Sequence, residues 1–334
     1  MTDLRFHGDA ELAPGLLDLA VNVRGSAPPP WLRDVLARSL DTLGGYPVQG
    51  DAVAAVARRH ARSTDDVLLT AGAAEAFVLL ARALTPRRAV VVHPGFTEPE
   101  AALRAAGHEV EQVVLAAPYD ALVVPDDADL VVVGNPTNPT GLVHDVAALC
   151  RPGRVTVVDE AFADAVAGET ASVAGRADLP GLVVVRSLTK TWALAGLRVG
   201  YLLADPQLVA RLRDAQPLWP VSTPALAAVV ACLSPAALAE ADDAARATAE
   251  ERWRLEGLLR GLGVTVTAGS EAPYLLCEVP GHPDVRDRLR DLGIAVRRGD
   301  TFPGLGPDHF RVAVRDRAAS DRLVAALWAV LAAF

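Results

Sequence analysis

The chain has very little lysine. Its 334 residues include 32 Lys and Arg residues, and Lys190 is the only lysine among them. Arginine stays protonated, whereas a lysine amine can lose its proton in an apolar setting and condense with a carbonyl. Lys190 lies between two apolar runs, 182–187 and 199–203, that are typical of buried strands. A lysine in such a place is unusual unless it is paired or reactive. An arginine-rich composition could also leave a single lysine by chance, but the position of Lys190 favours a reactive amine.

Several other features are scarce or missing. Cys150, Cys232 and Cys277 are far apart and odd in number, which argues against a disulfide framework or zinc site and favours thiols in a cytoplasmic protein. The seven histidines show no metal-ligand spacing, so we expect no metal. The net charge of −9 does not indicate the basic surface that a nucleic-acid-binding protein needs, so we expect no nucleic-acid partner. No apolar run approaches the ~18 residues of a membrane span. Residues 1–9 lack an apolar signal segment, and we expect no membrane partner.

The order of apolar patterns predicts the fold class. Half of the residues are hydrophobic, enough for a large domain and a smaller one. Short apolar runs alternate with helical patterns, which predicts an α/β domain with a mostly parallel sheet covered by helices on both faces. Seven strands are expected, at 67–70, 89–93, 109–115, 130–134, 155–159, 182–187 and 199–203. Helices are expected at 30–43, 51–62 with Asp51 as N-cap, 73–84, 98–107, 144–150 and 224–233.

The rest of the chain predicts a smaller α+β domain and an arm. A long helix at 235–261 leads from one domain into the other. Strands are then expected at 264–267, 274–279, 294–297 and 310–314, with helices at 283–292 and 318–333. Residues 1–30 contain little periodicity and end in three prolines, so they predict an extended arm without packed elements. We therefore expect an arm at 1–30 lying against the small domain, a large domain at 31–233 and a small domain at 234–334.

Polar motifs occur where strands of the large domain end, which is where ligands gather in α/β sheets. Ala73 and Ala74 follow a glycine at an expected helix start, so their amides form a candidate anion site, although an ordinary helix start would have the same pattern. Asn138 lies in a rigid Asn-Pro-Thr-Asn-Pro-Thr-Gly loop after a buried strand. Asp159 ends another buried strand, and a carboxylate there is costly without a partner. A protonated pyridine nitrogen is a suitable one.

The surroundings of Lys190 indicate a phosphorylated aldehyde. Ser187 precedes the lysine by three residues and Arg198 follows it by eight, so a hydroxyl and a guanidinium flank the amine. Arginine can clamp a phosphate through two hydrogen bonds, and a serine can add a third. Pyridoxal 5′-phosphate (PLP) has this chemistry, and its enzymes hold it as a lysine Schiff base.

Four motifs resemble landmarks of the class I/II aminotransferases, PLP enzymes of fold type I. They are Asn-Pro-Thr-Asn-Pro-Thr-Gly, Asp-Glu-Ala-Phe, Ser-Leu-Thr-Lys and Gly-Leu-Arg-Val-Gly-Tyr, and the resemblance covers nearly all of the chain. It implies that Lys190 and Asp159 are catalytic and that a homodimer forms. The implied cofactor contacts are Asn138 to the ring hydroxyl, Asp159 to the ring nitrogen, Ser187 and Arg198 to the phosphate, Phe96 stacked on the ring, and Tyr46 reaching the phosphate in the neighbouring subunit.

Within this family the chain resembles threonine-phosphate decarboxylases of cobalamin synthesis first and histidinol-phosphate aminotransferases second. The His7-Gly8 opening, the stretch 17–22 and the tail 294–315 carry that resemblance. It implies four substrate-binding residues: His7, Asn22, Arg297 facing a substrate phosphate and Arg311 gripping the α-carboxylate. We expect a small phosphorylated amino acid as substrate. The motifs leave decarboxylation and transamination open, and a catalytically silent PLP-binding protein is a third alternative.

Overall fold

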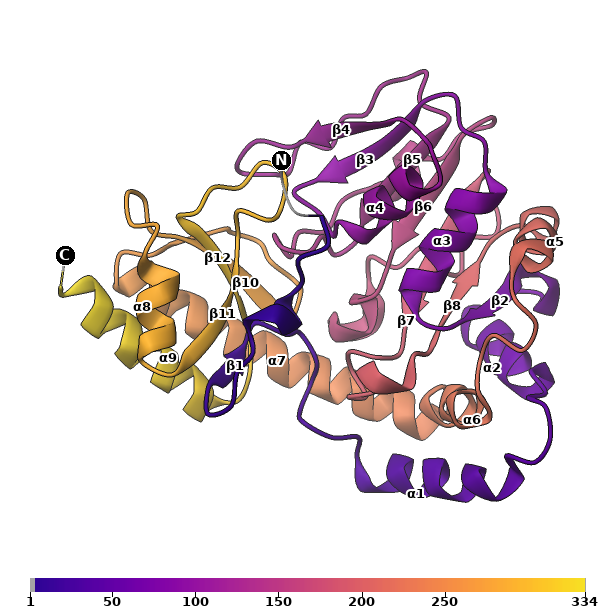
Figure 1. Ribbon diagram of the computed structural model, residues 1–334, viewed down its shortest axis with the longest axis horizontal. Coiled ribbons are helices and arrows are strands. Elements are labelled where there is room, and N and C mark those ends of the chain that lie inside the picture. Colours follow the sequence, from indigo (N-terminus) through magenta and orange to yellow (C-terminus); the bar gives the residue numbers. More distant parts are fainter. Residues whose placement is uncertain (1–3, 334) are drawn as a thin grey trace.

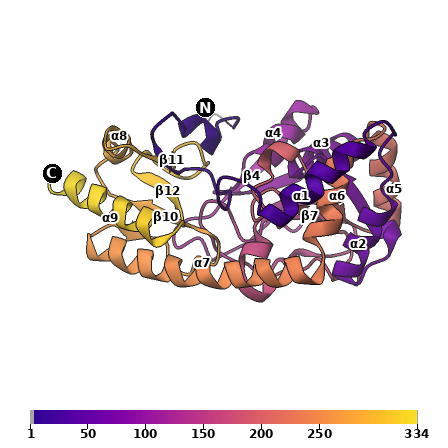
Figure 2. The ribbon, with the colours of Figure 1, turned by 90° about the horizontal axis from the view of Figure 1, so that it is seen from below.

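Two β-sheets lie side by side in this protein. The computed structural model describes residues 4–333; residues 1–3 and 334, the outer ends of the predicted arm and small domain, lie outside the described residues. One sheet has seven strands and the other five. The helix α7 (Pro235–Gly261) runs along both sheets, as the long orange helix in Figure 2 shows. The two sheets therefore share one continuous helix as well as the chain segments that cross between them (Figure 1).

The seven-stranded sheet is mostly parallel, as predicted. Its strand order is β2-β8-β7-β6-β5-β3-β4, and only β8 is antiparallel to its neighbours. The strands are β2 (Val67–Thr70), β3 (Ala89–His93), β4 (Val110–Val114), β5 (Leu130–Gly134), β6 (Val155–Asp159), β7 (Leu182–Ser187) and β8 (Gly200–Leu203). The central strands are runs of valine and leucine buried on both faces, as a doubly covered parallel sheet requires.

Helices cover both faces of this sheet, which confirms the predicted layers. One face packs against α3 (Ala73–Ala83), α4 (Glu98–Ala105) and α5 (Pro206–Ala215), and the other against α1 (Pro30–Ser39), α2 (Gly50–His60) and α6 (Thr223–Cys232). Because side chains alternate along a strand, neighbouring residues of β2 enter different cores. Leu68 lies in the core that contains Phe77 of α3, and Leu69 lies in the core that contains Val56 of α2.

The five-stranded sheet has the order β1-β11-β12-β10-β9. Its strands are β1 (Leu17–Leu19), β9 (Thr265–Val266), β10 (Tyr274–Glu278), β11 (Ile294–Arg298) and β12 (His309–Ala313). The helices α8 (Val285–Asp291) and α9 (Arg317–Leu331) and the end of α7 bury Leu289, Leu323 and Leu255 in one core with this sheet. Only the β1–β11 pair is parallel. Indigo β1 thus lies at the edge of this sheet, beside β11 from the opposite end of the chain (Figure 1).

Several sequence predictions were wrong. The first 30 residues contain packed elements, the short helix η1 (Gly8–Glu11) and strand β1, which are too short to show a period. Helix α5 was not predicted, and the expected helix at 144–150 is only the 3₁₀ turn η4 (Val146–Leu149). Asp51 is not an N-cap: α2 begins at Gly50, and Asp51 lies in its first turn, where its charge faces the helix dipole. The domain boundaries stay a prediction.

The remaining 3₁₀ turns are short connections. They are η2 (Leu40–Thr42), η3 (Thr64–Asp66), η5 (Ala163–Ala165), η6 (Ala167–Glu169) and η7 (Ala195–Leu197).

Across residues 4–333, no single helix is long and apolar enough to cross a membrane. Only α6 and α7 taken together, a pair bent by 73°, meet that test of length and composition.

Candidate active site

A cavity of about 480 Å³ lies at the carboxyl ends of β5, β6 and β7 and extends to the five-stranded sheet. All of the predicted cofactor and substrate residues line it except Tyr46: His7, Asn22, Ala73, Ala74, Phe96, Asn138, Asp159, Ser187, Lys190, Arg198, Arg297 and Arg311. These residues come from distant parts of the sequence. The parallel strands bring Asn138, Asp159, Ser187 and Lys190 together, because these strands end at the same edge of the sheet. Arg297 and Arg311 come from the five-stranded sheet, and His7 and Asn22 from the N-terminal segment.

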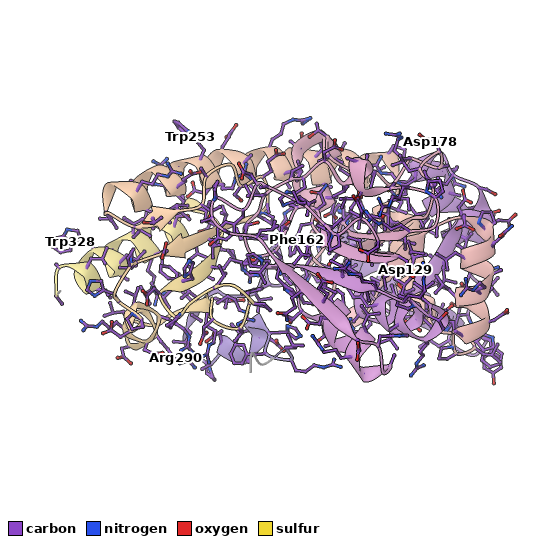
Figure 3. The ribbon with its side chains drawn as sticks, turned by 90° about the horizontal axis from the view of Figure 1, so that it is seen from above. Asp129, Phe162, Asp178, Trp253, Arg290 and Trp328 are labelled. Atoms are coloured by element: carbon purple, nitrogen blue, oxygen red, sulfur yellow. The ribbon has the colours of Figure 1, made fainter. Side chains whose placement is uncertain are left out.

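Lys190 follows β7 and points its amine toward the aromatic ring of Phe162. The distance from Nζ to the ring centroid is 5.9 Å. Phe162 lies near the middle of the molecule, between the two sheets (Figure 3). Burial, together with the positive charges of Arg311 and Arg198, lowers the pKa of Lys190 to about 8, although the charge of Asp159 acts in the opposite direction. A substantial fraction of this amine is therefore neutral near physiological pH, as a nucleophile or a base requires.

Asp159 ends β6 and is almost fully buried. Its Oδ1 accepts a hydrogen bond from the Ala161 N–H at 3.0 Å. Burial raises the pKa of Asp159 to about 6, although the Ala161 amide and the charge of Lys190 both act in the opposite direction. A cation beside this carboxyl would relieve the cost of its burial, so Asp159 suits the protonated ring nitrogen of a pyridine.

One end of the cavity is built to hold an anion. Helix α3 begins there with Gly72 as its N-cap, and no side chain caps the free amides. A Cβ at Gly72 would come within 2.6 Å of Arg198 Nη2, so the guanidinium lies against the helix N-terminus. The hydroxyls of Ser187 and Thr189 are 2.7 Å apart and line the same cavity. Amides, guanidinium and hydroxyls together fit a phosphate.

The other end of the cavity carries two arginines that have no carboxylate partner. Arg297 and Arg311 are register partners on β11 and β12. Arg311 donates from Nη1 to Asn138 Oδ1 at 2.5 Å and from Nη2 to the carbonyl of Ala20. Arg297 donates to the carbonyls of Phe6 and Arg298. Within residues 4–333, neither guanidinium forms an ion pair, and burial lowers the pKa of both.

Aromatic rings help to hold these arginines. The Cζ atom of Arg297 lies 4.8 Å from the ring centroids of both Phe6 and Phe302, and that of Arg311 lies 5.3 Å from Tyr274. Such contacts orient a guanidinium without neutralising it. The two positive charges are thus held in place and stay available for an anion.

Asn22 and His7 differ in how far their polar atoms are engaged. Asn22 is 6% exposed, and neither its Oδ1 nor its Nδ2 has a hydrogen-bond partner among the described residues. An unpaired buried amide in the wall of a cavity suits a ligand contact. His7 Nε2 lies 2.7 Å from Glu98 Oε1, and its ring is 5.3 Å from that of Phe96. His7 therefore already supports Phe96 from the side.

The sequence prediction missed some lining residues. Thr189 lies in the same motif as Ser187, and its hydroxyl was a signal that could have been used. Glu98 and Phe302 also line the cavity, but Phe302 comes from a loop whose sequence carries no periodic signal. Tyr46 lies outside the cavity and is 73% exposed, with its ring stacked on Trp219 at 4.1 Å between centroids. Its predicted contact with a neighbouring subunit stays a prediction.

No group of three or more His, Cys, Asp or Glu side chains in the described part of the chain is arranged to hold a metal ion.

Comparison with known proteins identifies the family. The family described as Aminotransferase class I and II matches residues 19–327, and the chain belongs to it. A histidinol-phosphate aminotransferase of Mycobacterium bovis is 51% identical over 93% of this chain and 87% of its own length. A threonine-phosphate decarboxylase of Salmonella typhimurium is 32% identical over 95% of this chain and 91% of its own. The expected order of resemblance is therefore reversed, because the histidinol-phosphate relative is the more similar of these two.

Solved structures agree on the fold. The histidinol-phosphate aminotransferase from Clostridium acetobutylicum superposes with a TM-score of 0.85 at 24% identity, over 96% of this chain and all of the other. The enzyme from Sinorhizobium meliloti, solved in complex with pyridoxal-5′-phosphate, has a TM-score of 0.82 at 22% identity, over 94% of this chain and 90% of the other. The fold is that of the PLP fold type I enzymes, and the cofactor of this aminotransferase family is PLP.

The single lysine allows a direct measurement of its pKa. Protein grown with carbon-13 lysine will show one lysine ε-carbon resonance, and in the cofactor-free protein we expect a titration midpoint near pH 8. Arg311→Gln should raise the midpoint, because it removes a positive charge that lowers the pKa. Arg322→Gln, on α9 away from the cavity, should leave it unchanged. A wild-type midpoint near the ordinary 10.5 would contradict this environment for Lys190.

Proposed function

We propose that this chain is a PLP-dependent aminotransferase of the histidinol-phosphate type. The observation that carries the proposal is the pair Arg297 and Arg311, two buried guanidinium groups without carboxylates beside the proposed cofactor site. Such a pair is costly unless anions neutralise it, and a phosphorylated substrate supplies the charge. The 51% identity to a histidinol-phosphate aminotransferase supports this substrate class over the decarboxylase that the sequence motifs favoured.

Each residue has a role in this proposal. Ala73, Ala74, Ser187, Thr189 and Arg198 would bind the cofactor phosphate. Asn138 would bind the ring hydroxyl and Asp159 would keep the ring nitrogen protonated. The cofactor, when bound, supplies an aldehyde that reacts with amines and a ring that withdraws electrons. Lys190 would hold that aldehyde, and its amine would move a proton at the substrate Cα, since its pKa of about 8 suits a base near neutral pH.

Substrate binding would divide between the two arginines. Arg311 would receive the α-carboxylate of an amino acid, and its contact with Asn138 ties that group to the cofactor site. Arg297 would receive the phosphate. Histidinol phosphate has no α-carboxylate, so its phosphate would face both arginines, while the amino acid that exchanges the amine would use Arg311. Bidentate pairs of this kind fix orientation as well as adding affinity.

A threonine-phosphate decarboxylase is the second candidate. A decarboxylase relative that is 32% identical over 95% of the chain favours it. Both substrates carry an amine and a phosphate and would use the same arginines. They differ in the bond that breaks at Cα, because decarboxylation releases CO₂ without first removing a proton from that carbon.

An assay with two substrates distinguishes the candidates. With histidinol phosphate and 2-oxoglutarate we expect glutamate to form, and with threonine phosphate we expect little CO₂. CO₂ from threonine phosphate without glutamate from histidinol phosphate would replace the proposal by the second candidate. Turnover of neither substrate would overturn both assignments.

Arg297→Ala tests the phosphate assignment. It should weaken the binding of the histidinol-phosphate transition state, measured through kcat/KM, by about 2–5 kcal/mol. The reason is that Arg297 is buried, so its pair with the phosphate would be buried too. The loss of kcat/KM for glutamate, which has no phosphate, should be much smaller. Arg298→Ala is the matched control, because this neighbouring arginine is paired with Asp300 and lies outside the cavity. Equal losses on both substrates would remove Arg297 from phosphate binding.

We also propose a homodimer, supported by exposed apolar side chains around Tyr46. Tyr46 and Trp219 stack on each other at the surface, and Leu40, Leu43, Val48 and Leu218 in the same two segments are also exposed. Exposed apolar groups gathered in this way are typical of interfaces. With a partner subunit on this surface, Tyr46 would be the residue that the family resemblance assigns to the partner's cofactor phosphate.

Light scattering should therefore find a dimer. Tyr46→Phe should keep the dimer and modestly weaken PLP retention, because only one hydroxyl contact is lost. The control is Trp253→Phe, an exposed aromatic of α7 that points away from the body of the protein (Figure 3). A fully active monomer would rule out a contribution from the second subunit.

A further inference from the structure

Two buried charged residues lie directly beside the cofactor anchors but face away from the cavity. Asp159 ends β6 and Ser187 ends β7, and both line the cavity. Glu160 and Arg186 are their chain neighbours. Because side chains alternate along extended backbone, these two point to the other side of the sheet. Neither lines the large cavity, and Arg186 lines a smaller one of about 120 Å³ that Ser187 also borders. Glu160 is 1% exposed and Arg186 is 5% exposed.

The two residues form an ion pair between the strand ends. Arg186 Nη1 lies 2.9 Å from Glu160 Oε2. The other oxygen of Glu160 accepts the Val173 N–H at 2.7 Å, and Ser172 donates to Oε2 at 2.6 Å. Both carboxylate oxygens of Glu160 are thus engaged, which a buried ion pair needs if it is to be tolerated.

A second carboxylate extends the ion pair to a helix. Arg186 Nη2 lies 2.9 Å from Glu169 Oε2, and Arg59 of α2 lies 2.9 Å from Glu169 Oε1. These partners raise the pKa of Arg186 and lower that of Glu169, so the charges persist through the physiological range. The strand ends are therefore connected to α2 through charged groups.

Backbone pairing between β6 and β7 is thin where these side chains act, although β7 stays paired with β8 as far as Ser187. The ladder between β6 and β7 ends with Asp159 opposite Val185, and beyond it only the Glu160 N–H reaches back, to the Val185 carbonyl at 2.9 Å. Buried ion pairs add little stability compared with well-packed apolar side chains, but in some proteins they specify one geometry. The ion pair between Glu160 and Arg186 therefore joins the end of β6, which carries Asp159, to the end of β7, which carries Ser187.

We propose that Arg186 and Glu160 are positioning residues for the cofactor. Their ion pair holds the ends of β6 and β7 in one relative placement, and so sets the distance between the ring-nitrogen partner Asp159 and the phosphate ligand Ser187. Glu160 also anchors the segment that leads to Phe162, whose ring lies beside Lys190. The inference rests on the proposed placement of the cofactor and is independent of which substrate is used.

The test compares two buried arginines. Arg186→Gln should raise the Kd of the cofactor-free protein for PLP and, at a temperature where the variant is folded, lower kcat by about 10²-fold, as expected for misplaced reacting groups. Arg62→Gln is the matched control. Arg62 forms a buried ion pair with Asp66 at 2.9 Å, at the opposite edge of the same sheet, so its loss should reduce thermal stability but not PLP affinity or kcat.

The outcomes separate positioning from stability. A folded Arg186→Gln protein with wild-type Kd for PLP and wild-type kcat would overturn the inference. So would an Arg62→Gln protein that loses as much PLP affinity as Arg186→Gln. If Arg186→Gln does not fold, Arg186→Lys takes its place: it retains the charge but cannot contact both carboxylates, so we expect a Kd above that of wild type. A wild-type Kd and kcat for Arg186→Lys would then overturn the inference.

Discussion

The structure depends on the common edge at which its parallel strands end. Pairing inside the sheet satisfies the hydrogen-bonding groups of the strand backbones. The polar side chains at the ends of the strands take no part in that pairing. At this edge β5 leads to Asn138, β6 ends in Asp159 and β7 leads through Ser187 to Lys190. The strands themselves consist mostly of buried valine and leucine, so the residues at and just beyond their ends can be polar and can form a binding site.

The electrostatics of the cavity follow from the arrangement of these residues. The cavity is lined by Lys190, Arg198, Arg297 and Arg311, and the charge of Asp159 opposes their effect on the pKa of Lys190. Burial first and the neighbouring positive charges second lower the pKa of the lysine, and the same positive charges attract anions. A cofactor phosphate at one end and an anionic substrate at the other would neutralise the arginines. The positive charges that help to make the lysine reactive would thus also favour a cofactor and a substrate that each carry an anionic group.

Much of this could be predicted from the sequence, for identifiable reasons. The strands of the large sheet are continuous apolar runs between turns, so five of the seven were predicted with the bounds that the structure has, and the motifs after them mark the cavity. Strand β1 was missed because three residues show no period and its partner β11 lies more than 270 residues away along the chain. The aromatic contacts of Arg297 with Phe6 and Phe302 were missed for the same reason, since only tertiary packing brings those loops together.

The central claim is that Lys190 holds the cofactor, and its being the only lysine makes the test simple. The protein would be loaded with PLP, reduced with borohydride to make any covalent link permanent, digested and mapped by mass spectrometry. The account predicts one modified side chain, Lys190, in stoichiometric yield. An unmodified Lys190, with label absent or confined to the amino terminus, would contradict it.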